Sequence, residues 1–322
     1  GIGTASDGRA KSIYAPLPAG QARALRAAYA DAGVSPRTVE LVEAHGTGTK
    51  AGDACEFEAL RTVYSEASDE KGWCALGSVK SQIGHTKAAA GAAGLIKAAL
   101  ALSNKVLPPT IKVEAPNPAL AIDDSPFYLS TEARPWLRAD HPRRAAVSAF
   151  GFGGSNFHVV LEEYRSARAA PAWDGSAEIV AFSGADASAL AAELDAFDRI
   201  EDGDVARFAA ASRARFSPAD PHRLLLVLEA GADRRSRIAA ARRLLREGPG
   251  HLPEGVHHGV GAPGGLALLF PGQGSQRVGM LRDLACVFPE MLAALEASGD
   301  VARAIHPPPT FDPKVRAAQG EA

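Results

Sequence analysis

Glu43-Ala-His45-Gly-Thr-Gly-Thr49 is a glycine-rich segment with a histidine just before its first glycine. The segment that leads into it, residues 39–44, has the sequence Val-Glu-Leu-Val-Glu-Ala and predicts a short strand. The glycines beside the histidine let a substrate approach the backbone and make positive φ angles accessible. We therefore expect a reactive or binding loop at the end of a strand.

A second histidine stands in a matching context, Lys80-Ser-Gln-Ile-Gly-His85. Residues 74–79 predict a strand before it, and residues 86–102 predict a long helix after it, whose small residues indicate a place inside the fold. A histidine at a helix N-terminus lies near the positive end of the dipole, which favours the neutral imidazole. Two neutral imidazoles can donate hydrogen bonds to one developing negative charge. Packed loop histidines fit the residues equally well.

Strands and helices alternate around these two loops. Residues 18–32 predict a helix that ends at Gly33, and Asp53 with Glu56 forms a capping-box pattern at the start of another. The apolar residues of this second helix share one face and are Phe57, Leu60, Val63 and Tyr64. Further strands are expected at 127–131, 145–149 and 156–161. The alternation predicts an α/β layered domain.

The last two of these strands are joined by a third loop, Ala149-Phe-Gly-Phe-Gly-Gly-Ser-Asn156. Its glycines do not form a dinucleotide-binding fingerprint, because the loop leads into a strand where that fingerprint needs a helix. The loop is either a plain β-turn or a tight turn that offers backbone N–H groups to an oxyanion. A metal site built from His45, Asp53 and His85 is disfavoured, since no ligand spacing occurs within one element.

Composition excludes several classes of function. With 22% charged residues and a formal net charge of −2, the chain has no electrostatic reason to bind nucleic acid or a membrane. No apolar run could span a bilayer, and the start at Gly1 lacks the features of a signal peptide. Cys55, Cys74 and Cys286 show no metal-ligand spacing and are expected to be reduced thiols of a cytoplasmic protein. Because the start reads as the middle of a loop, we expect an internal piece of a larger protein.

Three zones differ in amino-acid composition and in their predicted secondary structure, which predicts three domains. Residues 1–164 hold the alternating strands and helices described above. Residues 165–263 are rich in alanine and arginine and predict a small α/β spacer domain. Residues 264–322 open with a strand-like run at 266–270 and are too few for an independent α/β domain.

The three loops together carry a family resemblance. Residues 1–164 resemble the C-terminal half of a β-ketoacyl synthase (ketosynthase) of the thiolase fold, through Glu43-Ala-His-Gly-Thr-Gly-Thr49, Lys80-Ser-x-x-Gly-His85 and Gly151-Phe-Gly-Gly-Ser-Asn156. Residues 266–280 resemble the opening of a malonyl/acyl-CoA:ACP acyltransferase, and the zone between resembles the linker domain of type I synthases. The implied fold class is α/β: half of a thiolase-like layered fold, a small α/β linker domain and the N-terminal edge of an acyltransferase α/β domain.

The resemblance is to type I polyketide and polyunsaturated fatty acid synthases. Residues 51–59 and 305–311 are most similar to the iterative synthases that make polyunsaturated fatty acids. The implied partners are malonyl and acyl thioesters and an acyl carrier protein, whose phosphopantetheine arm is a substrate arm and not a bound cofactor. The resemblance also implies a homodimer of the full-length parent.

The activity implied is a decarboxylative condensation of an acyl thioester with malonyl-ACP to 3-oxoacyl-ACP. His45 and His85 would polarise the malonyl thioester and stabilise the enolate, and Lys80 would orient them. The remaining implied roles are an oxyanion-hole N–H at Phe152, loop freedom at Gly151, pantetheine contacts at Thr47 and Thr49, and an acyltransferase oxyanion-hole glutamine at Gln273.

The nucleophiles of both families are missing from the chain. The ketosynthase cysteine would lie upstream of Gly1 and the acyltransferase serine beyond Ala322, and none of the three cysteines lies in a strand-to-helix elbow. Without a nucleophile covalent acyl transfer is impossible, so we predict that this piece alone is inactive in condensation. One alternative is an inactive ketosynthase-like scaffold that docks a carrier protein or partner chains, although such a scaffold has no need of the histidines. A nicotinamide-binding oxidoreductase would rest on the glycine loops alone.

Overall fold

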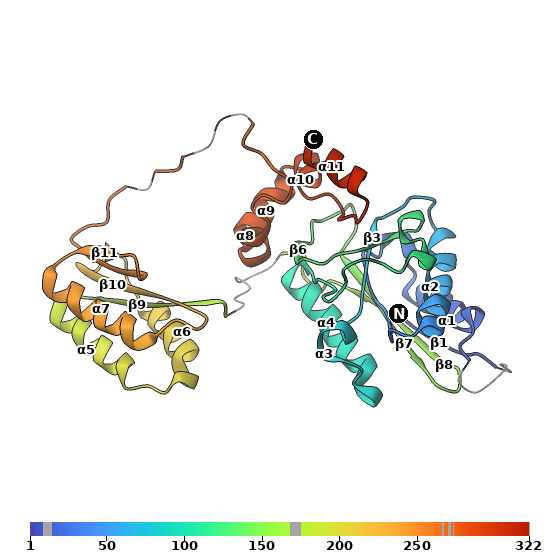
Figure 1. Ribbon diagram of the computed structural model, residues 1–322, viewed down its shortest axis with the longest axis horizontal. Coiled ribbons are helices and arrows are strands. Elements are labelled where there is room, and N and C mark those ends of the chain that lie inside the picture. Colours follow the sequence, from blue (N-terminus) through green and yellow to red (C-terminus); the bar gives the residue numbers. More distant parts are fainter. Residues whose placement is uncertain (9–14, 168–174, 266, 270–271, 273, 322) are drawn as a thin grey trace. The chain divides into compact units, whose positions relative to one another are not determined.

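The chain forms two compact units in a computed structural model (Figure 1). The residues that the structure describes are 1–8, 15–167, 175–265, 267–269, 272 and 274–321. The first unit comprises Gly1–Ala172 and Gln273–Ala322, and the second comprises Trp173–Gly272. The chain thus leaves the first unit, forms the second and returns to the first.

A six-stranded mixed sheet is the centre of the first unit. Its strands, in spatial order, are β1 (Ile2–Ser6), β8 (Ser155–Glu162), β7 (Arg144–Gly151), β2 (Leu41–Glu43), β3 (Cys74–Gly77) and β5 (Phe127–Leu129). Strands β7, β2, β3 and β5 are parallel, whereas β8 is antiparallel to both β7 and β1. Because β2 and β3 are adjacent and Glu43 lies opposite Gly77, the loops that follow these strands leave the same edge of the sheet.

Helices cover both faces of this sheet (Figure 1). Helices α1 (Pro18–Ala32) and α2 (Lys50–Ser65) pack on one face, and α4 (Ala90–Asn104) packs on the other. Successive side chains of a strand point to opposite faces, so Val42 joins the core under α1 and α2 while Leu41 joins the core under α4. The α/β layered architecture expected from the alternation of strands and helices is confirmed, and α1 ends as expected at Gly33, whose φ is 65°.

Shorter elements complete the first unit. They are the helix α3 (Lys80–Ile83), the strand pair β4 (Val106–Leu107) and β6 (Arg134–Pro135), and 3₁₀ turns at Pro36–Thr38, Lys87–Ala89, Pro118–Leu120 and Ile122–Asp124.

The start of α2 differs from the sequence expectation. The helix begins at Lys50, and its N-cap is Thr49, whose hydroxyl accepts the N–H of Gly52 at 3.2 Å. The Asp53 carboxylate reaches back to the N–H of Gly48 at 3.1 Å. The predicted capping box is therefore wrong: Thr49, four residues before Asp53, is the N-cap, so Glu56 is not needed as a cap.

The long helix after His85 also starts later than expected, at Ala90. Its small residues Ala98 and Ala101 pack on the sheet, but Ile96 and Leu100 on other faces are 61% and 56% exposed. The expectation of a helix inside the fold therefore holds for one face only.

The second unit is a four-stranded antiparallel sheet with three packed helices. The strand order is β11 (Gly250–Leu252), β12 (Val256–Val260), β10 (His222–Glu229) and β9 (Ala177–Gly184). The helices are α5 (Ala187–Asp198), α6 (Val205–Arg215) and α7 (Arg234–Glu247), with a 3₁₀ turn at Asp202–Asp204. Leucine and phenylalanine side chains from the sheet and all three helices share one core.

The C-terminal part of the chain is helical. Its helices are α8 (Arg282–Val287), α9 (Pro289–Ala297), α10 (Asp300–Ile305) and α11 (Pro313–Glu321). The strand expected at 266–270 is not formed where the structure describes it: residues 267–269 are irregular, and Leu268 and Leu269 are 70% and 93% exposed. A strand needs a hydrogen-bonded neighbour, and no described strand pairs with these residues.

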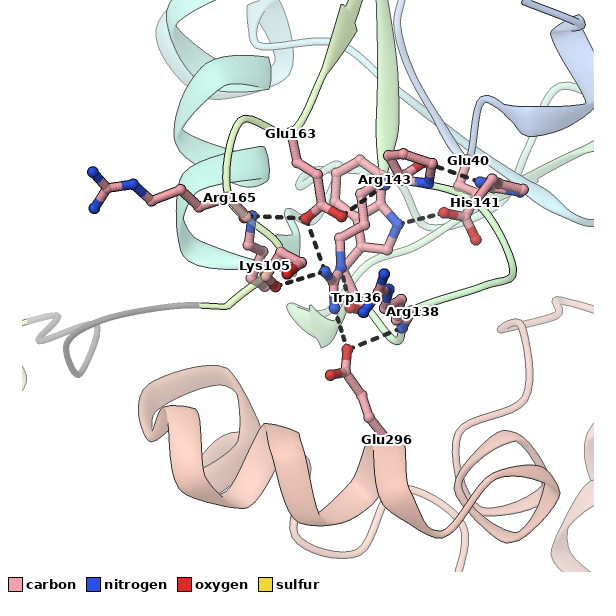
Figure 2. A network of polar contacts seen from close by, with 11 residues as sticks. Glu40, Lys105, Trp136, Arg138, His141, Arg143, Glu163, Arg165 and Glu296 are labelled. Carbon is pink, nitrogen blue, oxygen red and sulfur yellow. Dashed lines mark hydrogen bonds and ion pairs between the residues drawn. The ribbon is translucent and has the colours of Figure 1, made fainter.

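Arg143 joins α9 to the sheet of the first unit (Figure 2). Its side chain is fully buried and forms ion pairs with Glu163, at 2.9 Å, and with Glu296 on α9. It also donates a hydrogen bond to the carbonyl of Trp136 at 2.7 Å, and Lys105 adds a second cation 2.8 Å from Glu163. Since a buried charge is tolerated only when it is paired, this network holds α9 in place.

Candidate active site

The three glycine-containing loops meet around one cavity of about 690 Å³. Six of the eight site residues expected from the sequence line it, namely His45, Thr47, Thr49, His85, Gly151 and Phe152. They come from the loops after β2 and β3 and from the turn between β7 and β8, which the parallel pairing of β2 with β3 and with β7 brings together. The other two, Lys80 and Gln273, do not line it: Lys80 lies nearby, and Gln273 lies outside the described residues.

The two histidines face each other edge to face, with ring centroids 5.5 Å apart. Burial lowers the pKa of His45 to about 4, and the charges of Lys80 and His85 act in the same direction. The pKa of His85 is also lowered, by burial first and then by the charges of Lys80 and Lys87. Both rings are therefore neutral at pH 7 and can donate a hydrogen bond without carrying charge.

A hydrogen bond to the backbone fixes the tautomer of His85. Its Nδ1 accepts the N–H of Lys87 at 3.0 Å, so the proton of the neutral ring is on Nε2. The expectation that His85 stands at the entry of the long helix is wrong, because α4 begins at Ala90 after a 3₁₀ turn. Burial and neighbouring lysines keep this ring neutral in place of the helix dipole.

Glu56 holds the loop that carries His45. Its two carboxylate oxygens accept the backbone N–H groups of His45, at 2.7 Å, and Gly46, at 2.8 Å. Burial raises the pKa of Glu56 to about 7, and these two hydrogen bonds oppose that rise. The sequence pattern predicted only a capping role for this residue. The available signal was its position on the helix, four residues before the buried Leu60 and therefore on the apolar face.

Lys80 lies behind the His45 loop. It lines a neighbouring cavity of about 340 Å³, together with Thr47 and Glu56. Burial lowers the pKa of Lys80, while the negative charges of Glu56 and Glu43 raise it. The charge of Lys80 contributes to the lowered pKa of His45, and the orienting role expected of Lys80 remains a prediction.

The turn between β7 and β8 is a β-turn, closed by a hydrogen bond from the N–H of Gly154 to the carbonyl of Gly151 at 3.2 Å. Gly153 and Gly154 have φ of 83° and 76°, which glycine adopts without strain. Asp7 holds the turn in place. Its carboxylate accepts a hydrogen bond from Asn156 Nδ2 at 2.7 Å, and a Cβ added to Gly154 would lie only 2.6 Å from the Cβ of Asp7. No sequence pattern pointed to Asp7, because its partner lies 149 residues away.

The three cysteines do not provide a nucleophile at this cavity. Cys55 and Cys74 are buried, and burial raises the pKa of Cys55 to about 12 and that of Cys74 well above its usual range. A thiol reacts as the thiolate, so neither is reactive at neutral pH. None of the three is among the cavity-lining residues.

The described part of the chain contains neither a metal-binding cluster nor a membrane-spanning helix. No group of three or more histidine, cysteine, aspartate or glutamate side chains among those residues is arranged to hold a metal ion. Nor does any helix in the same residues combine the length and the apolar character that crossing a lipid bilayer requires.

Comparison with known protein families gives two matches. Residues 1–114 match the family "Beta-ketoacyl synthase, C-terminal domain", and residues 116–219 match "Ketoacyl-synthetase C-terminal extension". The chain is 42% identical over 306 residues to polyketide synthase GfsE of Streptomyces halstedii, which covers 91% of this chain and 8% of that protein. It is 48% identical over 166 residues to polyketide synthase PksL of Bacillus subtilis (strain 168), covering 51% of this chain and 4% of that protein.

Solved structures agree with these matches. The ketosynthase from module 6 of the bacillaene synthase from Bacillus subtilis 168 is 37% identical, with a TM-score of 0.50, over 77% of this chain and 43% of that one. The Streptomyces albus JA3453 oxazolomycin ketosynthase domain OzmH KS7 is 32% identical, with a TM-score of 0.52, over 80% of this chain and 45% of that one. The chain thus spans less than half of these solved ketosynthases and a smaller share of the relatives above.

Proposed function

Because residues 1–219 belong to the β-ketoacyl synthase family, as its C-terminal domain followed by its C-terminal extension, we propose that this chain supplies the histidine pair of a ketosynthase that elongates acyl chains. The observation that carries the proposal is the pair of neutral imidazoles in one cavity, His45 and His85. A neutral donor pair suits a reaction in which negative charge develops on an oxygen.

That reaction is a decarboxylative condensation. The bond between the malonyl carboxylate and the adjacent carbon breaks, CO₂ leaves, and the electron pair forms an enolate. Nε2–H of His85 donates to the enolate oxygen, and His45 provides the second donor. The enolate carbon then attacks the carbonyl of an acyl-cysteine thioester, whose thiolate leaves as 3-oxoacyl-ACP forms. The N–H of Phe152, in the turn that Gly151 begins, stabilises the oxyanion of this second step.

The cysteine of this reaction comes from another part of the protein. Cys55 and Cys74 are kept as thiols by burial, and none of the three cysteines lines the cavity, so the 322-residue chain alone does not condense acyl groups. The malonyl group arrives on the phosphopantetheine arm of an acyl carrier protein, along Thr47 and Thr49 at the cavity wall. The working enzyme is a cytoplasmic homodimer that makes polyketides or fatty acids, and residues 264–322 begin an acyltransferase domain.

The test replaces each histidine in the longest reading frame that encodes this chain. His45→Ala and His85→Ala should each lower 3-oxoacyl-ACP formation on the order of 10²- to 10⁴-fold, because each removes a donor to the developing charge. The matched control is His251→Ala, an exposed histidine on β11 of the second unit.

A scaffold would give another result. Product formation that is unchanged in the His45 and His85 variants, with intact assembly by size-exclusion chromatography, would support the scaffold and refute the proposal. Labelling of any native residue of the isolated chain by a radioactive acyl thioester would refute the claim that its nucleophile lies elsewhere.

A further inference from the structure

Glu43 forms a buried ion pair that the mechanism above does not use. It is the last residue of β2 and stands two positions before His45. Its carboxylate lies 2.9 Å from Nζ of Lys97 on α4, and the two side chains are 2% and 10% exposed. A buried ion pair contributes little net stability compared with apolar residues of the same volume. This pair therefore needs another explanation than stability.

The second oxygen of the Glu43 carboxylate contacts the other histidine loop. It accepts the backbone N–H of Val79 at 2.5 Å, and Val79 immediately precedes Lys80 and the α3 helix. The N–H of Ala44 also donates to the carbonyl of Gly77 across the same pair of strands, at 2.7 Å. One side chain thus connects the loop of His45 with the loop that carries Lys80 and His85.

The surrounding packing leaves this carboxylate little freedom. Gly94, one turn before Lys97 on α4, makes room for it, since a Cβ there would lie 3.0 Å from Cγ of Glu43 and 3.2 Å from Cγ1 of Val147. The ammonium group of Lys97 holds the carboxylate from the helix side. A side chain held on both sides fixes the groups that it binds.

We propose that Glu43 is a positioning residue of the condensing site, which uses Lys97 as its counter-ion and sets the place of the Lys80–His85 loop relative to His45. The inference rests on the proposed function of the two histidines. Glu43 touches no reacting atom: it acts by holding the Val79 N–H, and through it the start of the loop that presents His85. Together with Glu56, it gives each histidine loop its own buried carboxylate.

Two charge-free double variants separate the positioning role from the ion pair. Glu43→Gln/Lys97→Met keeps an oxygen that accepts the Val79 N–H, whereas Glu43→Leu/Lys97→Met removes it. Both lack the ion pair, and both are measured in the longest reading frame that encodes this chain, by release of CO₂ from malonyl-ACP. We expect the glutamine variant to stay within about 3-fold of the parent in kcat, and the leucine variant to lose on the order of 10²-fold at an unchanged KM, because a small displacement of catalytic groups is costly.

A control for simple loss of a buried cation is Lys105→Met, just after the C-terminal end of α4, where Lys105 pairs with Glu163 at 2.8 Å. It should lower the melting temperature without changing kcat. Equal kcat in the two double variants, whether retained or lost, would overturn the proposal. So would a loss of kcat in the leucine variant that the Lys105 variant reproduces at the same melting temperature.

The His45→Ala variant is measured alongside and keeps the two proposals apart. If His45→Ala leaves CO₂ release unchanged, the proposed function fails. If His45→Ala abolishes CO₂ release and the two Glu43 variants do not differ, only the positioning role fails.

Discussion

Replacing Glu56 by glutamine should change how the stability of the first unit depends on pH. Burial raises the pKa of Glu56 from 4.5 to about 7 in the folded chain. Between these values the folded chain keeps a proton that the unfolded chain has lost. The contribution of this group to stability is therefore fully present below pH 4.5 and is lost as the pH rises through about 7. Glutamine fits the same place and cannot ionise.

The size of the effect follows from the two pKa values. The interval from 4.5 to about 7 corresponds to roughly 3 kcal/mol in the free energy of unfolding. The parent should thus lose on the order of 3 kcal/mol relative to Glu56→Gln between pH 4.5 and pH 8. At any pH, the variant also places an NH₂ group against one of the two backbone N–H donors, which adds a constant cost of about 1–3 kcal/mol.

The assay is urea denaturation at a series of pH values, followed by tryptophan fluorescence. A Trp173→Phe background leaves Trp73, which stacks on Tyr64, and Trp136 as reporters of the first unit. The matched control is Glu58→Gln, which replaces an exposed acid two residues along the same helix. A constant difference between the parent and Glu56→Gln across the whole range would refute the reasoning.

Three other outcomes are expected. Burial lowers the pKa of His158 to about 3, so below pH 6.5 the unfolded chain gains a proton that the folded chain does not. The stability advantage of the parent over His158→Phe, measured by thermal melting, should therefore shrink as the pH falls from 6.5. Arg143→Met removes the cation that Glu163 and Glu296 share, although Glu163 keeps Lys105 as a partner. The free energy of unfolding, measured in urea, should fall by about 3 kcal/mol. A change below about 1 kcal/mol would contradict the role of this network in holding α9. Cys55 and Cys74 should resist iodoacetamide at pH 7.5 in the folded chain and react with it in urea, as measured by mass spectrometry. Rapid labelling of either cysteine in the folded chain would contradict their burial.

Local pattern was sufficient for the elements around the site. Residues close together in the sequence determine each of these elements: helix α1 with its end at Gly33, the apolar face of α2, and the hairpin of β7 and β8. The family resemblance carried by the loop motifs also predicted six residues of the cavity, and the parallel strands bring the loops that hold them to one edge of the sheet.

The contacts between distant segments could not be predicted from the sequence. Glu56 looked like a cap because Asp53 stands three residues before it, but the contacts of Glu56 are to backbone N–H groups ten and eleven residues earlier. Glu43 stood in a predicted strand with no partner assigned to it, and its partners Val79 and Lys97 come from two other elements. The sequence of one segment cannot predict the partners of a carboxylate when the order of strands in the sheet determines which other segments lie beside it.

The return of the chain to the first unit bears on the order in which the molecule folds. The contact of Arg143 with Glu296 closes a loop of 153 residues, and residues 173–272 of that loop form a unit of their own. If that unit folds first, the flexible part of the loop falls to roughly a third, which lowers the entropic cost of closure by only about 1 kcal/mol. Loss of the buried Arg143 ion pairs is expected to cost about 3 kcal/mol, which is more than this amount. Attachment of α9 should therefore depend little on prior folding of residues 173–272, and a flexible linker in their place should permit it nearly as well.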